Sequence, residues 1–204
     1  MRITKIQPQR GKKKYSIWID GTHAFSCGKE VLSDLSIKEG QELSSRELET
    51  LLTEIQKREA RKYSLSLLER RALSEAELKG KLRRRGYGSH IIDTLVRSLK
   101  EVDLIDDLNY ARSWVRNRST SSPRGALLLR RELKMKGIEA SVIHEVMEEF
   151  KQIYDEGELL AEVAEKRAKQ MSGLDSLTRK RRLFGYLLRR GFTLDEVKRV
   201  VTRY

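Results

Sequence analysis

Residues 78–87 read Leu-Lys-Gly-Lys-Leu-Arg-Arg-Arg-Gly-Tyr, and this stretch decides the fold because its apolar pattern occurs three times. Leucines four residues apart lie on one face of a helix, and a glycine that follows ends the helix because it tolerates a positive φ. The spacings between successive copies of the glycine are 51 and 54 residues. The three copies are Gly86-Tyr87 with Leu78 and Leu82, Gly137-Ile138 with Leu129 and Leu133, and Gly191-Phe192 with Leu183 and Leu187. The pattern predicts an internal repeat.

Apolar residues on both sides of each glycine extend the repeat to three helices. Six and nine residues after the glycines stand Ile92 and Leu95, Ile143 and Val146, and Val197 and Val200, each pair on one helical face. Upstream, Ala60 and Ala111 each precede a glycine by 26 residues and are followed three residues later by Tyr63 or Trp114. In the third copy either Ala161 or Ala164 takes this place. We therefore predict three-helix repeats over 60–105, 106–153 and 154–204.

Capping signals agree with these helices. Ser74 with Glu77, and Thr193 with Glu196, have the spacing of a capping box. Asp106 or Asp107 would cap the helix that opens the second repeat.

Residues 1–59 have a different pattern and are predicted to form a small N-terminal extension. A short extended segment reaches Pro8, and a second one alternates apolar and polar residues over 15–19. Asp20-Gly21 then predicts a tight hairpin turn into a further strand over 22–26. Ser44 and Glu47 form another capping box, which starts a helix with apolar residues at positions 48, 51, 52 and 55. The predicted fold is mainly helical, with three repeats in an elongated, curved array behind a β-hairpin.

Composition favours a polyanionic partner. The chain has 43 Lys+Arg against 30 Asp+Glu, a net charge of +13, and the segment 60–204 carries +11 of this excess. Such a surface is typical of proteins that bind nucleic acid or nucleoproteins, although a basic surface can also serve solubility alone. The single cysteine, Cys27, forms no intrachain disulfide. With no apolar signal core and no apolar run of membrane-spanning length, we expect a cytoplasmic protein without membrane contact.

The sequence offers no convincing catalytic or cofactor site. His23, His90 and His144 are scattered, and no P-loop, GxGxxG or CxxC motif is present, so no cofactor or metal is expected. A metal-dependent nuclease would use Asp106-Asp107 as metal ligands, but helix capping already explains a carboxylate there. We predict a non-enzymatic protein. No segment has the pattern of a dimerisation helix, so a monomer is expected.

Basic residues gather on the middle helix of every repeat and are the candidate partner-binding residues. Cations near a helix C-terminus complement its dipole, which explains Arg85, Lys136 and Arg190 but not the cations near helix starts. The predicted loop 117–125 is either a plain linker or a phosphate contact through its hydroxyls and its two arginines. The full candidate set is Lys79, Lys81, Arg83, Arg84, Arg118, Arg124, Arg130, Arg131, Lys134, Arg179, Arg181, Arg182, Arg189 and Arg190.

Several of these motifs together resemble the RecX family, the bacterial regulatory proteins of the RecA recombinase. The resemblance covers about residues 60–204. The first repeat is recognised by Leu68, Arg71, Ser74, Glu77-Leu78, Leu82 and Gly86-Tyr87, and the junction to the second by Leu104-Ile105-Asp106-Asp107 with Tyr110-Ala111. The second repeat is recognised by Gly125, Glu132-Leu133 and Lys136-Gly137-Ile138, and the third by Leu187 to Phe192. Residues 1–59 resemble the extension of longer members.

The resemblance implies a function. It implies three tandem three-helix units that lie along a RecA–DNA filament and suppress its ATP hydrolysis and strand exchange or limit its growth. It also implies direct contact with single- or double-stranded DNA. The alternative is a DNA-binding protein of the helix-turn-helix type that acts without RecA, although such proteins usually dimerise on spaced half-sites.

Overall fold

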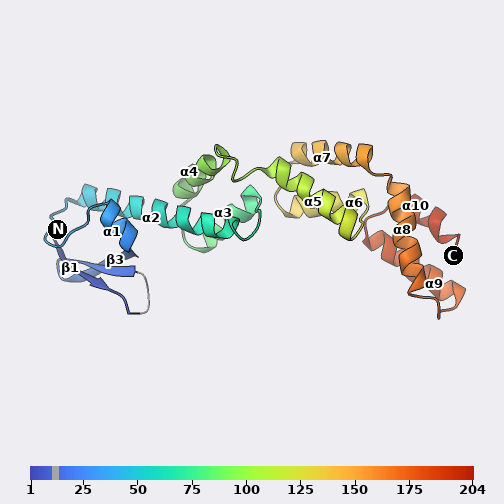
Figure 1. Ribbon diagram of the computed structural model, residues 1–204, viewed down its shortest axis with the longest axis horizontal. Coiled ribbons are helices and arrows are strands. Elements are labelled where there is room, and N and C mark those ends of the chain that lie inside the picture. Colours follow the sequence, from blue (N-terminus) through green and yellow to red (C-terminus); the bar gives the residue numbers. More distant parts are fainter. Residues whose placement is uncertain (11–13) are drawn as a thin grey trace. The chain divides into compact units, whose positions relative to one another are not determined.

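The computed structural model describes residues 1–10 and 14–204, and in these ranges the chain is mainly helical, as predicted (Figure 1). None of the described helices is both long and apolar enough to cross a lipid bilayer. The chain divides into two compact units, one of residues 1–70 and 82–98 and one of residues 71–81 and 99–204. The elements are β1 (Ile3–Pro8), β2 (Lys14–Ile19), β3 (Thr22–Gly28), α1 (Lys29–Asp34), α2 (Ser45–Leu68), α3 (Glu75–Arg84), α4 (Ser89–Lys100), α5 (Asp107–Ser121), α6 (Ala126–Met135), α7 (Ala140–Ile153), α8 (Glu156–Lys169), α9 (Ser176–Arg189) and α10 (Leu194–Val201).

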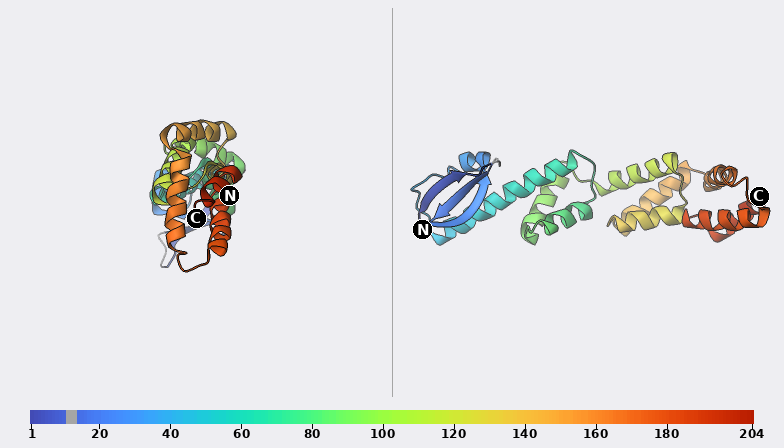
Figure 2. Two further views of the ribbon diagram at one scale, coloured as in Figure 1. Left: turned by 90° about the vertical axis from the view of Figure 1, so that its right-hand side faces the viewer. Right: turned by 90° about the horizontal axis from the view of Figure 1, so that it is seen from below.

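The N-terminal extension is a three-stranded antiparallel sheet in the order β1-β2-β3. The predicted turn between β2 and β3 is confirmed, since Asp20 and Gly21 have φ of 48° and 80°. Positive φ at both positions matches the right-handed twist of the hairpin strands. Ile3, Ile17 and Cys27 are fully buried and form one core with Ile55 of α2. The sheet lies beside α2, as the right-hand view of Figure 2 shows.

Helix α2 begins at the predicted capping box, in which the Ser44 side chain and Glu47 exchange hydrogen bonds. It then runs without a break for 24 residues, across the limit predicted between the extension and the first repeat at residues 59 and 60. Its first half packs on the sheet, and its second half carries Ala60, which is fully buried. The extension and the first repeat therefore share one helix.

The repeat register predicted from the glycines is confirmed. Gly86, Gly137 and Gly191 have φ of 87°, 74° and 86° and follow α3, α6 and α9. The six leucines that precede them are all fully buried, namely Leu78, Leu82, Leu129, Leu133, Leu183 and Leu187. In the third repeat Ala164 is fully buried and Ala161 only partly, which resolves the choice in favour of Ala164.

The predicted loop over 117–125 is shorter in the structure, because α5 continues to Ser121. Serine and threonine often favour loops, because their side chains compete for backbone hydrogen bonds. Instead, the hydroxyls of Ser119, Thr120 and Ser121 donate to carbonyls four residues back, at 2.9, 3.1 and 2.5 Å, so they satisfy the backbone within the helix. Arg118 therefore lies on a helix, and Arg124 lies in a short connection to α6.

Two joints, each between the middle helix of one repeat and the glycine turn of the next, are built alike. In the first, the Ser74 hydroxyl donates to the Lys136 carbonyl at 2.6 Å. In the second, the Gly125 amide donates to the Arg190 carbonyl at 2.9 Å. Ser74 and Gly125 both precede the first residue of a middle helix, and Lys136 and Arg190 both precede a glycine.

A carboxylate completes each joint. Asp107, the first residue of α5, accepts the Glu75 amide at 2.8 Å, and Glu156, the first residue of α8, accepts the Ala126 amide at 2.7 Å. The amides belong to the first residues of α3 and α6, which have no acceptor within their own helices. The joints thus fix the starts of α3 and α6.

Candidate functional site

The structure places the predicted basic clusters on α3, α6 and α9, the middle helices of the three repeats. The intramolecular contacts of these cations divide them into two groups. Six have a partner within the protein: Lys79 with Glu75 at 2.9 Å, Arg118 and Arg124 with Glu132, Arg130 with Glu148 at 4.0 Å, Arg179 with the Tyr204 carbonyl at 3.1 Å, and Arg190 with the Ser122 hydroxyl at 2.5 Å.

The other cations have no hydrogen-bond or ion-pair partner among the residues that the structure describes. They are Lys81, Arg83 and Arg84 on α3, Arg131 and Lys134 on α6, and Arg181, Arg182 and Arg189 on α9. All are exposed except Lys81, which is half-buried. Each middle helix therefore presents uncompensated positive charge to solvent. We call these eight residues the free cations.

The cation immediately before each glycine has a structural contact instead. The Arg85 guanidinium lies 4.2 Å from the centroid of the Tyr63 ring, the Lys136 ammonium 4.8 Å from that of Trp114, and the Arg190 guanidinium 5.0 Å from that of Tyr186. Cations over aromatic faces are attracted by the ring quadrupole. Helix-end electrostatics and ring contact together account for this position.

A buried carboxylate organises the end of α5. Glu132 on α6 is only 8% exposed, and it accepts a hydrogen bond from the Trp114 indole nitrogen at 2.9 Å. Arg118 lies 3.5 Å from it and Arg124 forms a close ion pair with it. A charge so buried is tolerated only when it is paired and hydrogen-bonded. Arg118 and Arg124 thus hold α5, its connection and α6 together, and their predicted role in partner binding stays a prediction.

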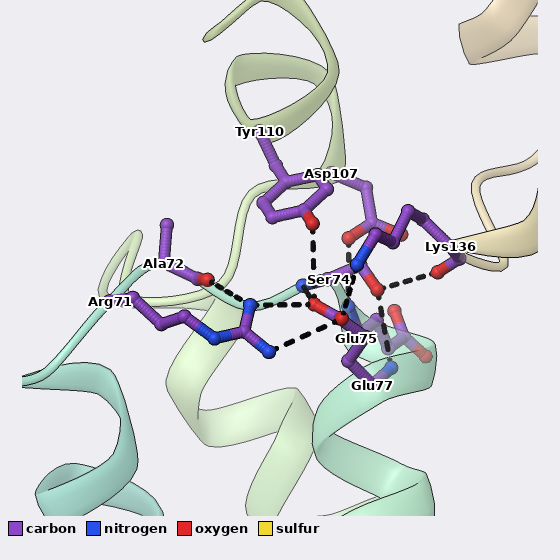
Figure 3. A network of polar contacts seen from close by, with 8 residues as sticks. All are labelled: Arg71, Ala72, Ser74, Glu75, Glu77, Asp107, Tyr110 and Lys136. Atoms are coloured by element: carbon purple, nitrogen blue, oxygen red, sulfur yellow. Dashed lines mark hydrogen bonds and ion pairs between the residues drawn. The ribbon is translucent and has the colours of Figure 1, made fainter. Parts of the chain in front are cut away.

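A second polar network surrounds Glu77 at the first joint (Figure 3). Its carboxylate accepts hydrogen bonds from Arg71 at 3.2 and 3.3 Å, from Lys136 at 2.8 Å and from the Tyr110 hydroxyl at 3.3 Å. Burial alone would raise the pKa of Glu77, but the bonds from Arg71 and Lys136 outweigh it and lower the pKa to about 2. The same surroundings, burial first and then the Glu77 charge, raise the pKa of Tyr110 to about 12.

We expect Glu77→Gln to remove a pH-dependent part of the stability. Because the folded pKa lies below the ordinary value of 4.5, ionised Glu77 stabilises the fold above that pH, and this contribution is lost as pH falls towards about 2. Urea unfolding should therefore show the variant to be less stable than the parent at pH 6, with a gap that narrows between pH 4.5 and 2. The control is Glu69→Gln, at an exposed glutamate whose side chain has no hydrogen bond or ion pair to another described residue. A gap independent of pH would contradict the expectation.

Asp106 and Asp107 both act on helix starts. The predicted cap is confirmed for Asp106, which accepts the Asn109 amide at 3.0 Å, while Asp107 accepts the Glu75 amide across the joint. Within residues 1–10 and 14–204, no group of three or more His, Cys, Asp or Glu side chains is arranged to hold a metal ion. Cys27 is buried, which raises the pKa of its thiol to about 11.

Sequence reasoning missed the two carboxylate centres. In the sequence Glu132 is a lone acid among cations, and its partners Trp114, Arg118 and Arg124 are 8 to 18 residues away along the chain. The capping box of Glu77 with Ser74 was predicted, and the Glu77 amide does donate to the Ser74 hydroxyl at 3.2 Å. The partner Lys136 lies 59 residues away and carries no local signal.

Comparison with known proteins gives a consistent result over nearly the whole chain. Family models match for the RecX N-terminal domain over residues 1–44 and for the first, second and third RecX three-helix domains over 60–99, 106–147 and 154–201. The chain is 30% identical to a protein named regulatory protein RecX from Caldanaerobacter subterraneus subsp. tengcongensis, over 98% of both chains. It is 30% identical to one of the same name from Clostridium acetobutylicum, over 98% of this chain and 94% of the relative. A crystal structure of a regulatory protein RecX aligns over 98% of both chains with a TM-score of 0.67 and 26% identity.

Proposed function

Since this chain belongs to the RecX family of regulatory proteins, we propose that it regulates the RecA recombinase, mainly negatively, by binding the RecA–DNA filament. Bound there, it would lower the rates of ATP hydrolysis and strand exchange and limit filament growth. It would do so in the cytoplasm as a monomer, without a cofactor and without catalysing a reaction itself.

The observation that supports the proposal most directly is the set of free cations. A cation already paired inside the protein contributes little to a partner, whereas an unpaired exposed cation can meet an acidic side chain or a phosphate without breaking a contact. Such cations recur on α3, α6 and α9. A partner with a repeating negative charge suits this arrangement better than a small substrate.

The proposal is tested by titrating the protein into preformed RecA filaments on single-stranded DNA and following ATP hydrolysis. We expect inhibition that saturates. Binding to the filament should also be tighter and less sensitive to salt than binding to the same DNA without RecA, because a contact made only with phosphates weakens steeply as salt rises. Equal affinity for bare DNA and filament would favour the alternative of a DNA-binding protein that acts without RecA.

Charge reversal on α6 should weaken filament binding without unfolding the protein. We expect the double variant Arg131→Glu and Lys134→Glu to bind on the order of tenfold more weakly, because like charges facing each other across an interface repel. The control reverses two exposed cations outside the free set, Lys151 and Lys169, whose only ion pairs with described residues are with nearby glutamates of their own helices. Unchanged inhibition by the α6 variant, with the control also unchanged, would show that the free cations on α6 are not used.

A further inference from the structure

A pocket of about 360 Å³ lies within the second compact unit, where the end of α5 meets α8 and α9. On one side it is lined by Ser121, Ser122 and Pro123, and on the other by residues of the third repeat. Its charged lining residues are Lys166, Arg167 and Arg190, with Glu162 as the one acidic residue. The pocket therefore carries an excess of positive charge.

Intramolecular contacts orient the two arginines. Arg190 donates to the Ser122 hydroxyl at 2.5 Å, and Arg167 donates to the Gln170 side-chain oxygen at 2.8 Å. Both guanidinium groups lie 5.0 Å from the centroid of the same ring, that of Tyr186. Two like charges are thus held near one ring, and an anion bound in the pocket that both arginines line would lower their repulsion.

Unused donors remain in and beside this pocket. The Nε atom of Arg167 is buried and has no hydrogen-bond partner in the described part of the chain. Lys166 is exposed, and no ion pair or hydrogen bond of its ammonium group is found among the same residues. Ser122 accepts from Arg190, so its own hydroxyl hydrogen is available to a ligand.

Arg124, in the α5–α6 connection, is paired with Glu132 but is also affected by the charge of Arg190. Burial, and then the charges of Arg118 and Arg190, lower the pKa of Arg124. Its Nε atom is also buried without a partner in the described residues. Helix-end electrostatics explains cations at the ends of α8 and α9 taken separately. It does not explain why they converge on one pocket beside a hydroxyl group.

We propose that this pocket binds a phosphate group, held by Arg167, Arg190 and Lys166 with the Ser122 hydroxyl as a further donor. The planar guanidinium matches the geometry of phosphate oxygens and forms short, charge-assisted hydrogen bonds with them. The phosphate can be a free anion or part of a nucleic-acid backbone, since both present the same oxygens. The proposal needs neither RecA nor a filament, so it stands apart from the proposed function.

The test measures binding of inorganic phosphate and of a single-stranded oligonucleotide by calorimetry, at constant ionic strength set with chloride. A free-anion site should bind inorganic phosphate with saturation. A site for the nucleic-acid backbone should bind the oligonucleotide, and an abasic oligonucleotide of equal length, much more tightly than inorganic phosphate. Saturable binding in neither arm would overturn the proposal.

Variants then locate the binding. Arg167→Gln and Lys166→Gln should each weaken binding about tenfold, the effect expected for loss of one hydrogen bond to a charged group. The matched control is Lys169→Gln, which removes the same charge from the same helix at a residue that does not line the pocket. Thermal unfolding shows whether the Arg167→Gln variant is folded. If that variant is unfolded, Lys166→Gln still tests the site, because Lys166 is exposed and its substitution should leave the fold intact. Equal weakening by Lys169→Gln would show attraction by overall charge and refute the site.

Discussion

Gly137→Ala is expected to destabilise the protein by about 2–5 kcal/mol, whereas Gly86→Ala should cost only about 1–2 kcal/mol. Both glycines have a positive φ, which carries a conformational cost for alanine. They differ in their surroundings, since a Cβ on Gly137 would lie 2.2 Å from the Cβ of Ala76, while a Cβ on Gly86 would have no atom within 4 Å. The extra cost at Gly137 is therefore the overlap at the first joint.

A compensating variant separates overlap from backbone strain. In Gly137→Ala combined with Ala76→Gly the overlapping methyl group is gone, and the next atom, the Cα of residue 76, lies 3.8 Å away. Urea unfolding followed by circular dichroism should show the double variant to be more stable than Gly137→Ala, although Ala76→Gly alone should cost up to about 1 kcal/mol in the helix. If Ala76→Gly instead lowers the stability of the parent and of Gly137→Ala equally, the start of α3 does not pack against the glycine turn at Gly137.

Glu132→Gln should cost about 3–5 kcal/mol, as when one partner of a buried ion pair is removed. The Trp114 indole could still donate to the amide oxygen, but Arg118 and Arg124 would lose their counter-charge, and the Arg124 side chain is only 18% exposed. The control is Glu148→Gln on α7, whose side chain is 45% exposed and pairs with Lys151, so its loss should cost far less than the loss of Glu132.

A second substitution tests the reason for the cost at Glu132. Replacing Glu132 and Arg124 together with leucine removes both buried charges, and such exchanges are often close to neutral. Unfolding in urea should therefore place the double leucine variant nearer to the parent than Glu132→Gln. Equal losses from Glu132→Gln and Glu148→Gln would show that the buried carboxylate does not stabilise the end of α5.

The elements predicted correctly depend on local spacing. Each glycine and its leucine pair predict a helix end and a buried face from about ten consecutive residues. The two residues Asp20-Gly21 are enough to predict the hairpin turn. The features that the sequence did not predict depend on two things: the choice of a side chain between helix and loop, and contacts between residues far apart in the chain. The hydroxyl residues at 119–121 favour a loop by composition, but in the structure they bond within α5.

The candidate site was predicted only as a composition of cations. Spacing along α3, α6 and α9 placed the clusters on the middle helices, but could not say which members are paired within the protein. The partners of Arg118, Arg124 and Arg190 come from other elements, and Ser122 and Arg190 are 68 residues apart in sequence. Only the fold distinguishes these arginines from the free cations.

The two joints have a consequence for how such a protein can arise and diverge. Each joint uses a main-chain carbonyl, a main-chain amide and a glycine, and few side chains must be kept: the Ser74 hydroxyl and the Asp107 carboxylate in the first joint, and the Glu156 carboxylate in the second. Because main-chain groups are the same in every residue, gene duplication can copy a unit together with its means of attachment. The other side chains are then free to change by mutation, so descendants of one ancestral unit can acquire different surfaces while still stacking in order.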